Sequence, residues 1–340
     1  TRLLELLTQA GRVVGVRVQR EGRVMTIGAR RGVLLAAGGF EHNQTMRESH
    51  LPKPTDAAWT AGSPGNQGEG IAAAVRIGAA TKFMDKAWWC TTLKVPGESA
   101  PRLSIFEKSM PGNYTVNTLG HRVANESQNY QMFMRTLHEK HASNENCCPL
   151  YMVFDADHRR KYPVGPLMPG KFVPDALVAR SWFSSGFLTR ANTLEELAER
   201  LRADPAGLAA TARRVSDFAR SGKDLEFARG ESLYDQYYGD PAVSPNPCLS
   251  ALEKPPFYAM RIDPGDFGTC GGLIVDTEAR VLDERGQPIE GLYATGNCTA
   301  GLLTTYPGPG ATLGPAMTFG YIAGLGLSAA EPAEIRISDS

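Results

Sequence analysis

The chain has 340 residues, of which 42% are hydrophobic and 21% charged, and its 36 Lys and Arg residues are balanced by 36 Asp and Glu residues. That composition fits a globular protein of one large or two ordinary domains, and it argues against a nucleic-acid partner, which needs a basic face. No apolar run reaches the roughly 18–20 residues of a transmembrane helix, and the six cysteines show no CxxC spacing, so we expect no membrane span and no metal site.

Taken in order, the first elements predict alternating strands and helices. Thr1–Arg31 reads as a helix followed by a hairpin. Val33–Ala37 is a continuous apolar run that ends at Gly38-Gly39, which is typical of a strand buried on both faces. A glycine-rich segment at residues 65–70 then leads into a helix that ends near Gly78, and its glycines allow the backbone to come close to a ligand.

From about Ala87 the chain changes character, because prolines interrupt the apolar segments. Thr193 and Glu196 form a capping box that begins a helix, and Pro205 separates this helix from a second amphipathic one. Strands are predicted at residues 111–117, 120–126 and 151–155, and residues 227–256 are predicted to be a loop. This block has the pattern of a separate α+β domain.

The last part of the chain returns to an α/β pattern. Gly291–Ala294 reads as a short buried strand, followed by a loop rich in Gly and Pro and by a helix with Leu313, Met317 and Tyr321 at helical spacing. A strand, a glycine loop and a helix in this order bring backbone N–H groups and a positive helix end up to an anionic or electron-rich ligand. We therefore expect one discontinuous α/β domain from residues 1–86 and 263–340, with an inserted α+β domain at 87–262.

A set of motifs runs through nearly the whole chain. They are Ala36-Ala-Gly-Gly-Phe-Glu-His-Asn, Gly68-Glu-Gly-Ile, Trp88-Trp89, Gly120-His-Arg-Val-Ala-Asn-Glu, Tyr237-Tyr-Gly-Asp-Pro, Gly265-Asp-Phe-Gly-Thr-Cys-Gly-Gly-Leu, Leu292-Tyr-Ala-Thr-Gly-Asn and Tyr306-Pro-Gly-Pro-Gly-Ala-Thr-Leu-Gly. In type and order they resemble the motifs of the fumarate reductase and 3-ketosteroid dehydrogenase group of FAD flavoproteins. The resemblance is closest to the 3-ketosteroid dehydrogenases.

This resemblance implies FAD as the cofactor and a Rossmann-like fold for the discontinuous domain, with the inserted domain acting as a catalytic cap. It also implies an oxidoreductase of steroid metabolism and lipid degradation. The family's N-terminal GxGxxG segment, which holds the FAD pyrophosphate, is absent from this sequence, so we expect a fragment or a chain without the front of the domain. A cytoplasmic location is expected, with peripheral contact to a membrane left open.

The reaction that the resemblance implies is removal of a proton beside the ketone of a 3-oxosteroid and of a hydride from the neighbouring carbon. Tyr306 and the backbone N–H of Gly310 match the pair that stabilises the enolate oxygen, and Tyr130 matches the proton-abstracting tyrosine. A further tyrosine that assists catalysis in the family lies in the absent part. The expected partners are a small apolar, steroid-like ketone and an electron acceptor that the sequence does not identify.

Residues that match cofactor-contacting positions of the family lie at strand ends and at the start of the last helix. They are Ala37, Gly38, Gly39, Glu69, Asn297, Thr312, Leu313 and Gly314. Four aromatic residues are candidates for an apolar pocket wall or for plain core: Trp88, Trp89, Phe183 and Phe187. His42, His121 and His158 have no recognised role and are expected at the surface.

Two other functions remain open. A fumarate reductase or succinate dehydrogenase relative would need cations for its dicarboxylate, but the positions where those relatives use two Arg and one His hold Tyr130, Pro307 and Gly268. The chain could also be an inactive fragment that binds an apolar ligand or a partner chain. Bound flavin would separate this last alternative from the dehydrogenase.

Overall fold

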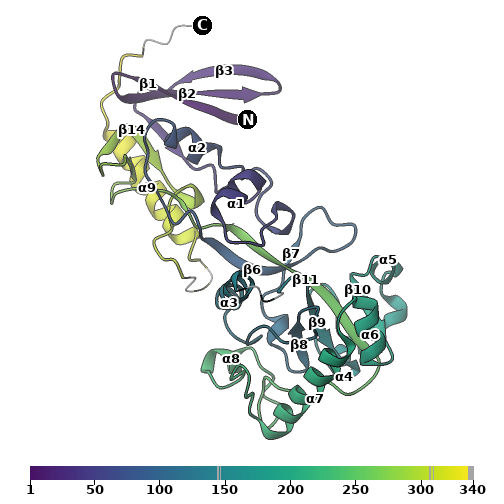
Figure 1. Ribbon diagram of the computed structural model, residues 1–340. Coiled ribbons are helices and arrows are strands. Elements are labelled where there is room, and N and C mark those ends of the chain that lie inside the picture. Colours follow the sequence, from purple (N-terminus) through teal and green to yellow (C-terminus); the bar gives the residue numbers. More distant parts are fainter. Residues whose placement is uncertain (144, 146, 306–307, 309, 336–340) are drawn as a thin grey trace. The chain divides into compact units, whose positions relative to one another are not determined.

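The computed structural model describes residues 1–143, 145, 147–305, 308 and 310–335 (Figure 1). The chain divides into two compact units. The first contains Thr1–Pro52, Gly62–Trp88 and Phe267–Ser340, and the second contains Lys53–Ala61 and Trp89–Asp266. Each unit therefore combines segments that are far apart in the sequence.

The first unit opens with an antiparallel sheet of three strands, β1 (Arg2–Gln9), β2 (Arg12–Arg20) and β3 (Arg23–Gly28). The predicted helix at the start of the chain is therefore wrong, because β1 pairs with β2 along its length. Ala10 and Gly11 make the turn between these strands with φ values of 50° and 82°. Positive φ at both central positions is the geometry that joins two twisted strands in a tight hairpin.

A second sheet of this unit contains a parallel pair, β4 (Val33–Leu35) and β14 (Pro288–Ala294), with β13 (Arg280–Leu282) antiparallel to β14. Parallel strands end at the same edge, so the loops that follow β4 and β14 emerge side by side. A hydrogen bond from the Thr295 N–H to the Leu35 carbonyl, 2.9 Å long, joins these two loops at their start.

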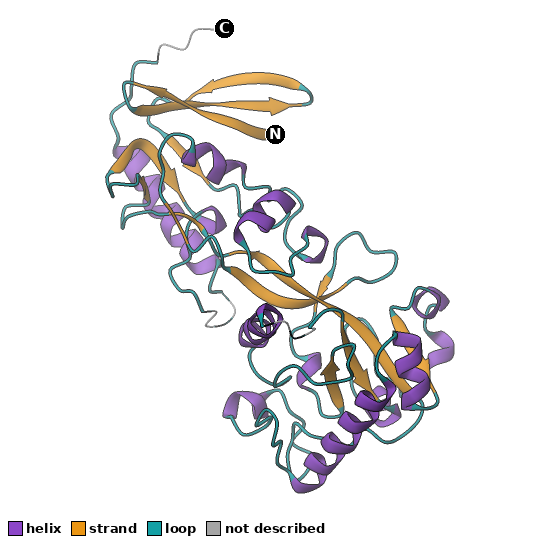
Figure 2. Ribbon diagram, in the orientation of Figure 1, coloured by secondary structure: helices purple, strands orange, loops and turns teal. Residues whose placement is uncertain are grey.

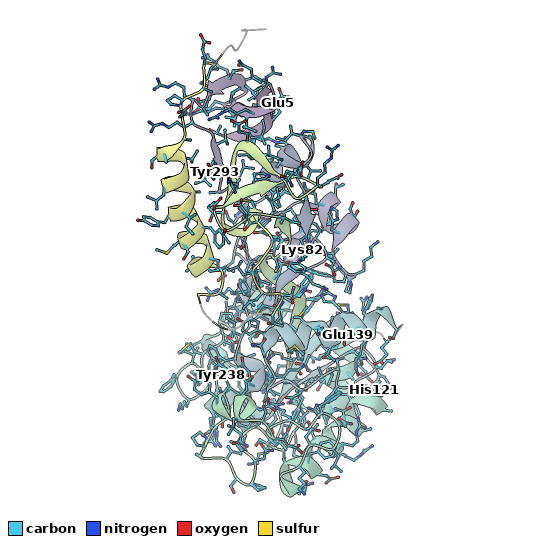
Figure 3. The ribbon with its side chains drawn as sticks, turned by 90° about the vertical axis from the view of Figure 1, so that its left-hand side faces the viewer. Glu5, Lys82, His121, Glu139, Tyr238 and Tyr293 are labelled. Atoms are coloured by element: carbon cyan, nitrogen blue, oxygen red, sulfur yellow. The ribbon has the colours of Figure 1, made fainter. Side chains whose placement is uncertain are left out.

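The last helix, α9 (Leu313–Ala329), lies along β14 (Figure 1). Tyr293, labelled in Figure 3, packs closely on it, because a Cβ added at Gly326 would lie 3.1 Å from its ring. The helix confirms the predicted spacing, but Leu313, Met317, Tyr321 and Leu325 form an exposed stripe, each being 53% to 75% exposed. Among the described residues, no helix combines the length and the apolar character needed to cross a membrane.

The remaining elements of the first unit are short. Asn43 begins α1 by accepting a hydrogen bond from the Met46 N–H through its side chain. Gly68 precedes α2 with a φ of 77°, and a Cβ there would lie 2.5 Å from the Met46 sulfur, so glycine is required. These elements are α1 (Gln44–His50), α2 (Glu69–Val75), β5 (Thr81–Lys82), β12 (Gly272–Leu273) and the 3-10 turn η4 (Gly296–Cys298).

The second unit is built on a sheet whose strands pair in the order β7-β6-β11-β9-β8, with β10 also on β11. The pairs β6-β7, β8-β9, β9-β11 and β10-β11 are antiparallel. Figure 2 shows helices packed against these strands. Leu197, Leu208 and Val215 from two of the helices are completely buried in the core. The strands are β6 (Ala87–Leu93), β7 (Arg102–Leu103), β8 (Asn113–Val116), β9 (Leu150–Phe154), β10 (Leu188–Ala191) and β11 (Phe257–Thr269).

Helices of the second unit follow the predicted starts in two cases. Thr193 accepts a hydrogen bond from the Glu196 N–H and begins α6, and Pro205 is the first residue of α7. The segment 227–256 is not loop throughout, because it contains α8, and residues 120–126 contribute a single bridge at Arg122 rather than a strand. The helices are α3 (Tyr130–Ala142), α4 (Ala156–Lys161), α5 (Arg180–Ser184), α6 (Leu194–Leu201), α7 (Pro205–Ser221) and α8 (Leu233–Tyr237), with 3-10 turns at Ala57–Trp59, Glu107–Ser109 and Asp175–Leu177.

Candidate functional site

Two cavities of about 410 Å³ each lie in the first unit at the edge where β4 and β14 end. They share Gly296, Asn297, Thr312 and Ala316, so the start of α9 and the turn η4 lie between them. We call the cavity that also contains Gly38 the glycine-side cavity, and the one that contains Trp88 the tryptophan-side cavity. Their volumes fall within the range of small-molecule and cofactor sites.

Four predicted cofactor residues line the glycine-side cavity: Gly38, Asn297, Thr312 and Leu313. Its other lining residues are Ala36, Asn66, Thr295, Gly296, Ala316 and Met317. Among these described residues there is no charged side chain. The cavity therefore offers amide and hydroxyl groups, together with backbone, to a neutral and polar part of a ligand.

Gly38 has a φ of 73°, a left-handed conformation that favours glycine. A Cβ at this position would lie 2.3 Å from Oδ1 of Asn66, so the backbone and this side chain are in direct contact. The Asn66 Nδ2 donates a hydrogen bond of 2.6 Å to Oε1 of Glu41. The loop that follows β4 is thus fixed against the loop that precedes α2.

Glu41 is completely buried, although it carries a carboxylate. Besides Asn66, its Oε2 accepts a long hydrogen bond of 3.4 Å from the Thr269 N–H. The buried Arg47 donates to the Glu41 carbonyl at 3.0 Å. Hydrogen bonding of this kind offsets the desolvation of a buried polar group, which is otherwise costly.

At the other wall, α9 begins at Thr312 and Leu313. The Thr295 hydroxyl donates to the Ala316 carbonyl at 2.7 Å and ties the first turn of this helix to the end of β14. Asn297 lies against Gly268, because a Cβ at Gly268 would come within 2.6 Å of its Nδ2. The N-terminal end of a helix stabilises negative charge, so this wall suits an electron-rich group.

The tryptophan-side cavity is mainly apolar, and Trp88 and Phe319 contribute its aromatic walls. Cys270 also lines it, and Cys298, the last residue of η4, is buried. Burial raises the pKa of both thiols to about 11. These cysteines are therefore protonated at neutral pH and unsuited to act as nucleophiles.

Other predicted cofactor residues do not line the glycine-side cavity. Ala37 packs toward α2, and Gly39 lies against Thr269, whose hydroxyl a Cβ would overlap. Glu69 forms an ion pair of 3.4 Å with Arg2. Gly314 is in the first turn of α9, where its N–H bonds to the carbonyl of Gly310, and Gly310 itself is exposed with a φ of 93°. Tyr306 lies outside the described residues, as does Pro307.

Tyr130 belongs to the second unit, where it is the first residue of α3 and only 8% exposed. Asn129 caps this helix through a hydrogen bond of 2.8 Å from the Gln131 N–H. Just upstream, the Lys108 ammonium donates to the carbonyls of Glu126 and Gln128, both at 2.9 Å. Burial lowers the pKa of Lys108 to about 8. The segment that leads into Tyr130 is therefore held from within the core.

The aromatic and histidine candidates fall in different places. Trp88 lines a cavity, whereas Trp89 packs on the His138 ring at 4.6 Å. Phe187 meets Trp182 edge to face, while Phe183 lines a wide, open hollow of the second unit that is mainly polar. The expectation that His158 lies at the surface is wrong, because it is only 2% exposed.

Asn66 is one of the lining residues that sequence reasoning missed. The glycines around it, in Gly65-Asn-Gln-Gly, were recognised as a place of close backbone approach. A short amide side chain within such a segment is itself a signal, because it can reach a ligand from the same loop. The buried Glu41, which follows Gly38-Gly39 in the sequence, gave no signal of its pairing with Asn66.

Comparisons with known proteins agree with this geometry. The model of the family described as FAD binding domain matches residues 1–313. A 3-oxosteroid 1-dehydrogenase of Mycolicibacterium smegmatis is 41% identical over 97% of this chain and 58% of its own length. A 4-oxocyclohexanecarboxylate 2-dehydrogenase of Sinomonas cyclohexanicum is 40% identical over 92% of the chain and 53% of its own length. The chain thus spans little more than half of these relatives.

Among solved structures, a 3-ketosteroid delta1-dehydrogenase from Sterolibacterium denitrificans, in complex with 1,4-androstadiene-3,17-dione, is 47% identical with a TM-score of 0.91. The match covers 96% of this chain and 59% of that one. A flavocytochrome c3 fumarate reductase is 25% identical with a TM-score of 0.68, and it covers 96% of this chain and 51% of its own. The mixed α/β architecture is therefore that of known flavoproteins.

Proposed function

The chain belongs to the FAD binding domain family, and we propose that it forms part of an FAD-dependent dehydrogenase that desaturates a 3-oxosteroid-type ketone. The observation that carries the proposal is the likeness to the Sterolibacterium denitrificans dehydrogenase, at 47% identity and a TM-score of 0.91. That protein was solved with a steroid dienone. A fold alone does not imply a function, so the proposal also rests on the residues of the cavities.

The glycine-side cavity fits part of an FAD molecule. Gly38 and Asn66 form a surface that a Cβ would fill, and α9 brings the positive end of its dipole to the opposite wall. Its uncharged lining suits the neutral flavin ring and the hydroxylated chain rather than the pyrophosphate. Gly38, Asn297, Thr312 and Leu313 would hold the cofactor here, with Ala37, Gly39, Glu69 and Gly314 as further predicted contacts.

The two parts of the chain would then have different tasks. The flanking segments, 1–86 and 263–340, would form a discontinuous Rossmann-like domain for FAD. The parallel pairing of β4 with β14, which are far apart in the sequence, supports this assignment. The inserted segment 87–262 would form the catalytic cap domain.

Three residues would act on the substrate. The Tyr306 hydroxyl and the Gly310 N–H would donate hydrogen bonds to the ketone oxygen and stabilise the enolate that develops there. Tyr130 would accept the proton from the neighbouring carbon. The chemistry that FAD supplies when bound is acceptance of a hydride.

A phenol is a weak base at neutral pH, because its ordinary pKa is ~10. Tyr130 would therefore need an environment that favours the phenolate. Its place as the first residue of the 13-residue helix α3 supports this role, since negative charge is stabilised in the first turn of a helix. A nearly buried side chain at the start of a capped helix also has little freedom to leave its position.

The test uses the full-length protein. We expect it to bind FAD and to reduce an artificial electron acceptor with androst-4-ene-3,17-dione as donor. Tyr306→Phe should lower turnover by about 10²–10³, the range for loss of one oxyanion donor, while FAD absorbance stays the same. Tyr321→Phe, on the exposed stripe of α9, is the matched control. Unchanged turnover in Tyr306→Phe would remove that residue from the mechanism.

Two substrates separate the alternatives. 4-Oxocyclohexanecarboxylate tests the chemistry named for the Sinomonas cyclohexanicum relative, and fumarate with a reduced dye tests the reductase alternative. A side chain at residue 268 would meet Asn297, which argues against a substrate-binding residue at that position. Reduction of fumarate by the full-length protein would overturn the dehydrogenase proposal, and absence of bound flavin would favour the inactive alternative.

A further inference from the structure

Asn66 lines the glycine-side cavity, and one end of its side chain is fixed inside the protein. Its Nδ2 donates to Oε1 of Glu41 at 2.6 Å. Its backbone is held as well, because its N–H donates to Ser63 and its carbonyl accepts from the His42 N–H at 3.1 Å. The residue therefore has little freedom in either its backbone or its side chain.

The orientation of the amide follows from the chemistry of its partner. A carboxylate only accepts hydrogen bonds, so the NH₂ end of Asn66 must face Glu41 and the oxygen must face away from it. A Cβ on Gly38 would lie 2.3 Å from Oδ1 and 2.9 Å from Nδ2, so the amide oxygen is the end of the side chain nearer to the Gly38 backbone. Gly38 and Asn66 both line the glycine-side cavity. The amide oxygen therefore lies beside Gly38, at a wall of this cavity, while Glu41 holds the amide nitrogen.

Glu41 is itself tightly enclosed. A Cβ added at Gly39 would lie 2.7 Å from its Oε2, and one added at Gly62 would lie 2.6 Å from its Oε1. Two glycines therefore make room for this carboxylate, which is completely buried. Enclosure of this kind is what a preorganised binding group requires of the residues behind it.

We propose that Asn66 accepts a hydrogen bond from a hydroxyl group of the flavin nucleotide, and that Glu41 is the positioning residue that orients its amide. The inference rests on the proposed FAD site. The other lining residues are uncharged, so the ligand group that meets Oδ1 is a neutral donor, and the hydroxyls of the ribityl chain and of the ribose are such donors. Nothing in the sequence motifs assigned this role to Asn66.

The first experiment measures FAD affinity in flavin-depleted full-length protein by quenching of flavin fluorescence. Asn66→Ala should raise the Kd for FAD about threefold to tenfold, the effect of losing one neutral hydrogen bond. Gln67→Ala is the matched control, because its side chain bonds only locally, to the Pro64 carbonyl, and does not line the cavity. An unchanged Kd in Asn66→Ala overturns the inference. Failure of the wild type to bind FAD overturns the proposed cofactor as well.

A second variant tests the positioning role of Glu41 directly. In Asn66→Asp, two carboxyl groups would face each other at the present 2.6 Å, and one would take up a proton. The protonated Asp can still donate to Glu41, so FAD affinity should be close to that of the wild type at low pH. It should fall at least tenfold as the pH rises and the pair loses its proton.

Other ionisable groups near the pair are Arg47, which donates to the Glu41 carbonyl, and His42, whose Nε2 lies 3.0 Å from the Gly62 carbonyl. Wild-type protein measured over the same pH range corrects for both. A pH-independent affinity in Asn66→Asp contradicts the orienting role of Glu41. Thermal unfolding of each flavin-free variant shows whether a lost affinity comes from lost folding.

Binding of FMN, which contains the ribityl chain but not the ribose, distinguishes a ribityl hydroxyl from a ribose hydroxyl as the partner of Asn66. If Asn66→Ala weakens FAD and FMN binding by the same factor, the ribityl hydroxyl is the partner. If only FAD binding is weakened, the partner is the ribose. Both results support the inference and differ only in which end of the nucleotide occupies the glycine-side cavity.

Discussion

Arg122 and Glu126 form a doubly hydrogen-bonded ion pair in the core of the second unit, with Nε 2.9 Å from Oε1 and Nη2 2.7 Å from Oε2. Neither side chain is exposed. The same guanidinium binds both carboxylate oxygens of Asp224, and Arg229 approaches Glu126 at 3.1 Å. Burial alone would raise the pKa of Glu126, but the charges of Arg122 and Arg229 hold it below its ordinary value. The cluster fixes the segment that leads into Tyr130.

Glu126→Gln should destabilise the protein strongly. Removing one charge of a buried network leaves its partners uncompensated, at a cost of about 3–5 kcal/mol in unfolding free energy. Urea unfolding followed by tryptophan fluorescence measures the change. Glu226→Gln is the control, because Glu226 binds the same Arg122 at 3.3 Å but is partly exposed, and its loss should cost no more than ~1 kcal/mol. Equal stability of the two variants would contradict the prediction.

The acid stability of the protein should depend on His158. Burial lowers the pKa of this residue from its ordinary 6.5 to about 4, and its Nδ1 lies 2.9 Å from the Pro111 carbonyl. Between these pH values the unfolded chain binds a proton that the folded protein does not. Stability therefore falls as the pH drops through this window, by on the order of 3 kcal/mol.

His158→Gln should remove most of this dependence, because the new amide can donate to the same carbonyl but cannot titrate. His121→Gln, at an exposed position in the same unit, is the control for replacing a histidine by glutamine. The measurement is the unfolding free energy of wild type and both variants between pH 4 and 7. The prediction is wrong if His158→Gln and wild type lose stability in parallel.

Gly38→Ala should weaken FAD binding more than tenfold with little loss of fold. A left-handed backbone costs a non-glycine residue roughly 1–2 kcal/mol, and the new Cβ would displace Asn66 from its position. Gly65→Ala is the matched control, because no atom lies closer than 3.9 Å to a Cβ there. FAD titration of both variants is the measurement. Similar affinities would place the cofactor elsewhere.

Tyr130→Phe should lower turnover by about 10²–10⁴, the usual contribution of a positioned acid or base. The substitution keeps the ring of a nearly buried side chain, so the fold should remain intact. Tyr237→Phe, on the exposed face of α8, is the control. Steady-state assays give turnover, and FAD content is checked in the same samples. Turnover within threefold of wild type would exclude Tyr130 as the base.

Local sequence patterns predicted those elements whose starts are marked by residues of the element itself. The capping box at Thr193, the proline at 205 and the apolar run after Gly32 all correspond to element starts. The first eight-residue strand was mistaken for a helix, because Leu and Glu favour helices and nothing in Arg2–Gln9 alternates. Its conformation comes from pairing with β2, which a local pattern does not contain.

β11 shows the same limit in the second unit. Its 13 residues include Asp263, Pro264, Gly265 and Asp266, residue types that are depleted in strands. In the folded chain, Thr60 donates to the Asp266 carboxylate at 2.6 Å and a Cβ at Gly265 would lie 2.2 Å from the Trp59 carbonyl. The strand is thus determined by a segment some two hundred residues away. The pairing of Glu41 with Asn66 escaped prediction for the same reason.

The stripe of four large side chains along α9 has a practical consequence. An exposed apolar patch of this kind favours association between protein molecules. A recombinant polypeptide of residues 1–340 should therefore elute as aggregates unless the stripe is covered. Changing Tyr321 and Leu325, which line neither cavity, to Lys and Glu would be the first step toward a monodisperse sample for crystallisation.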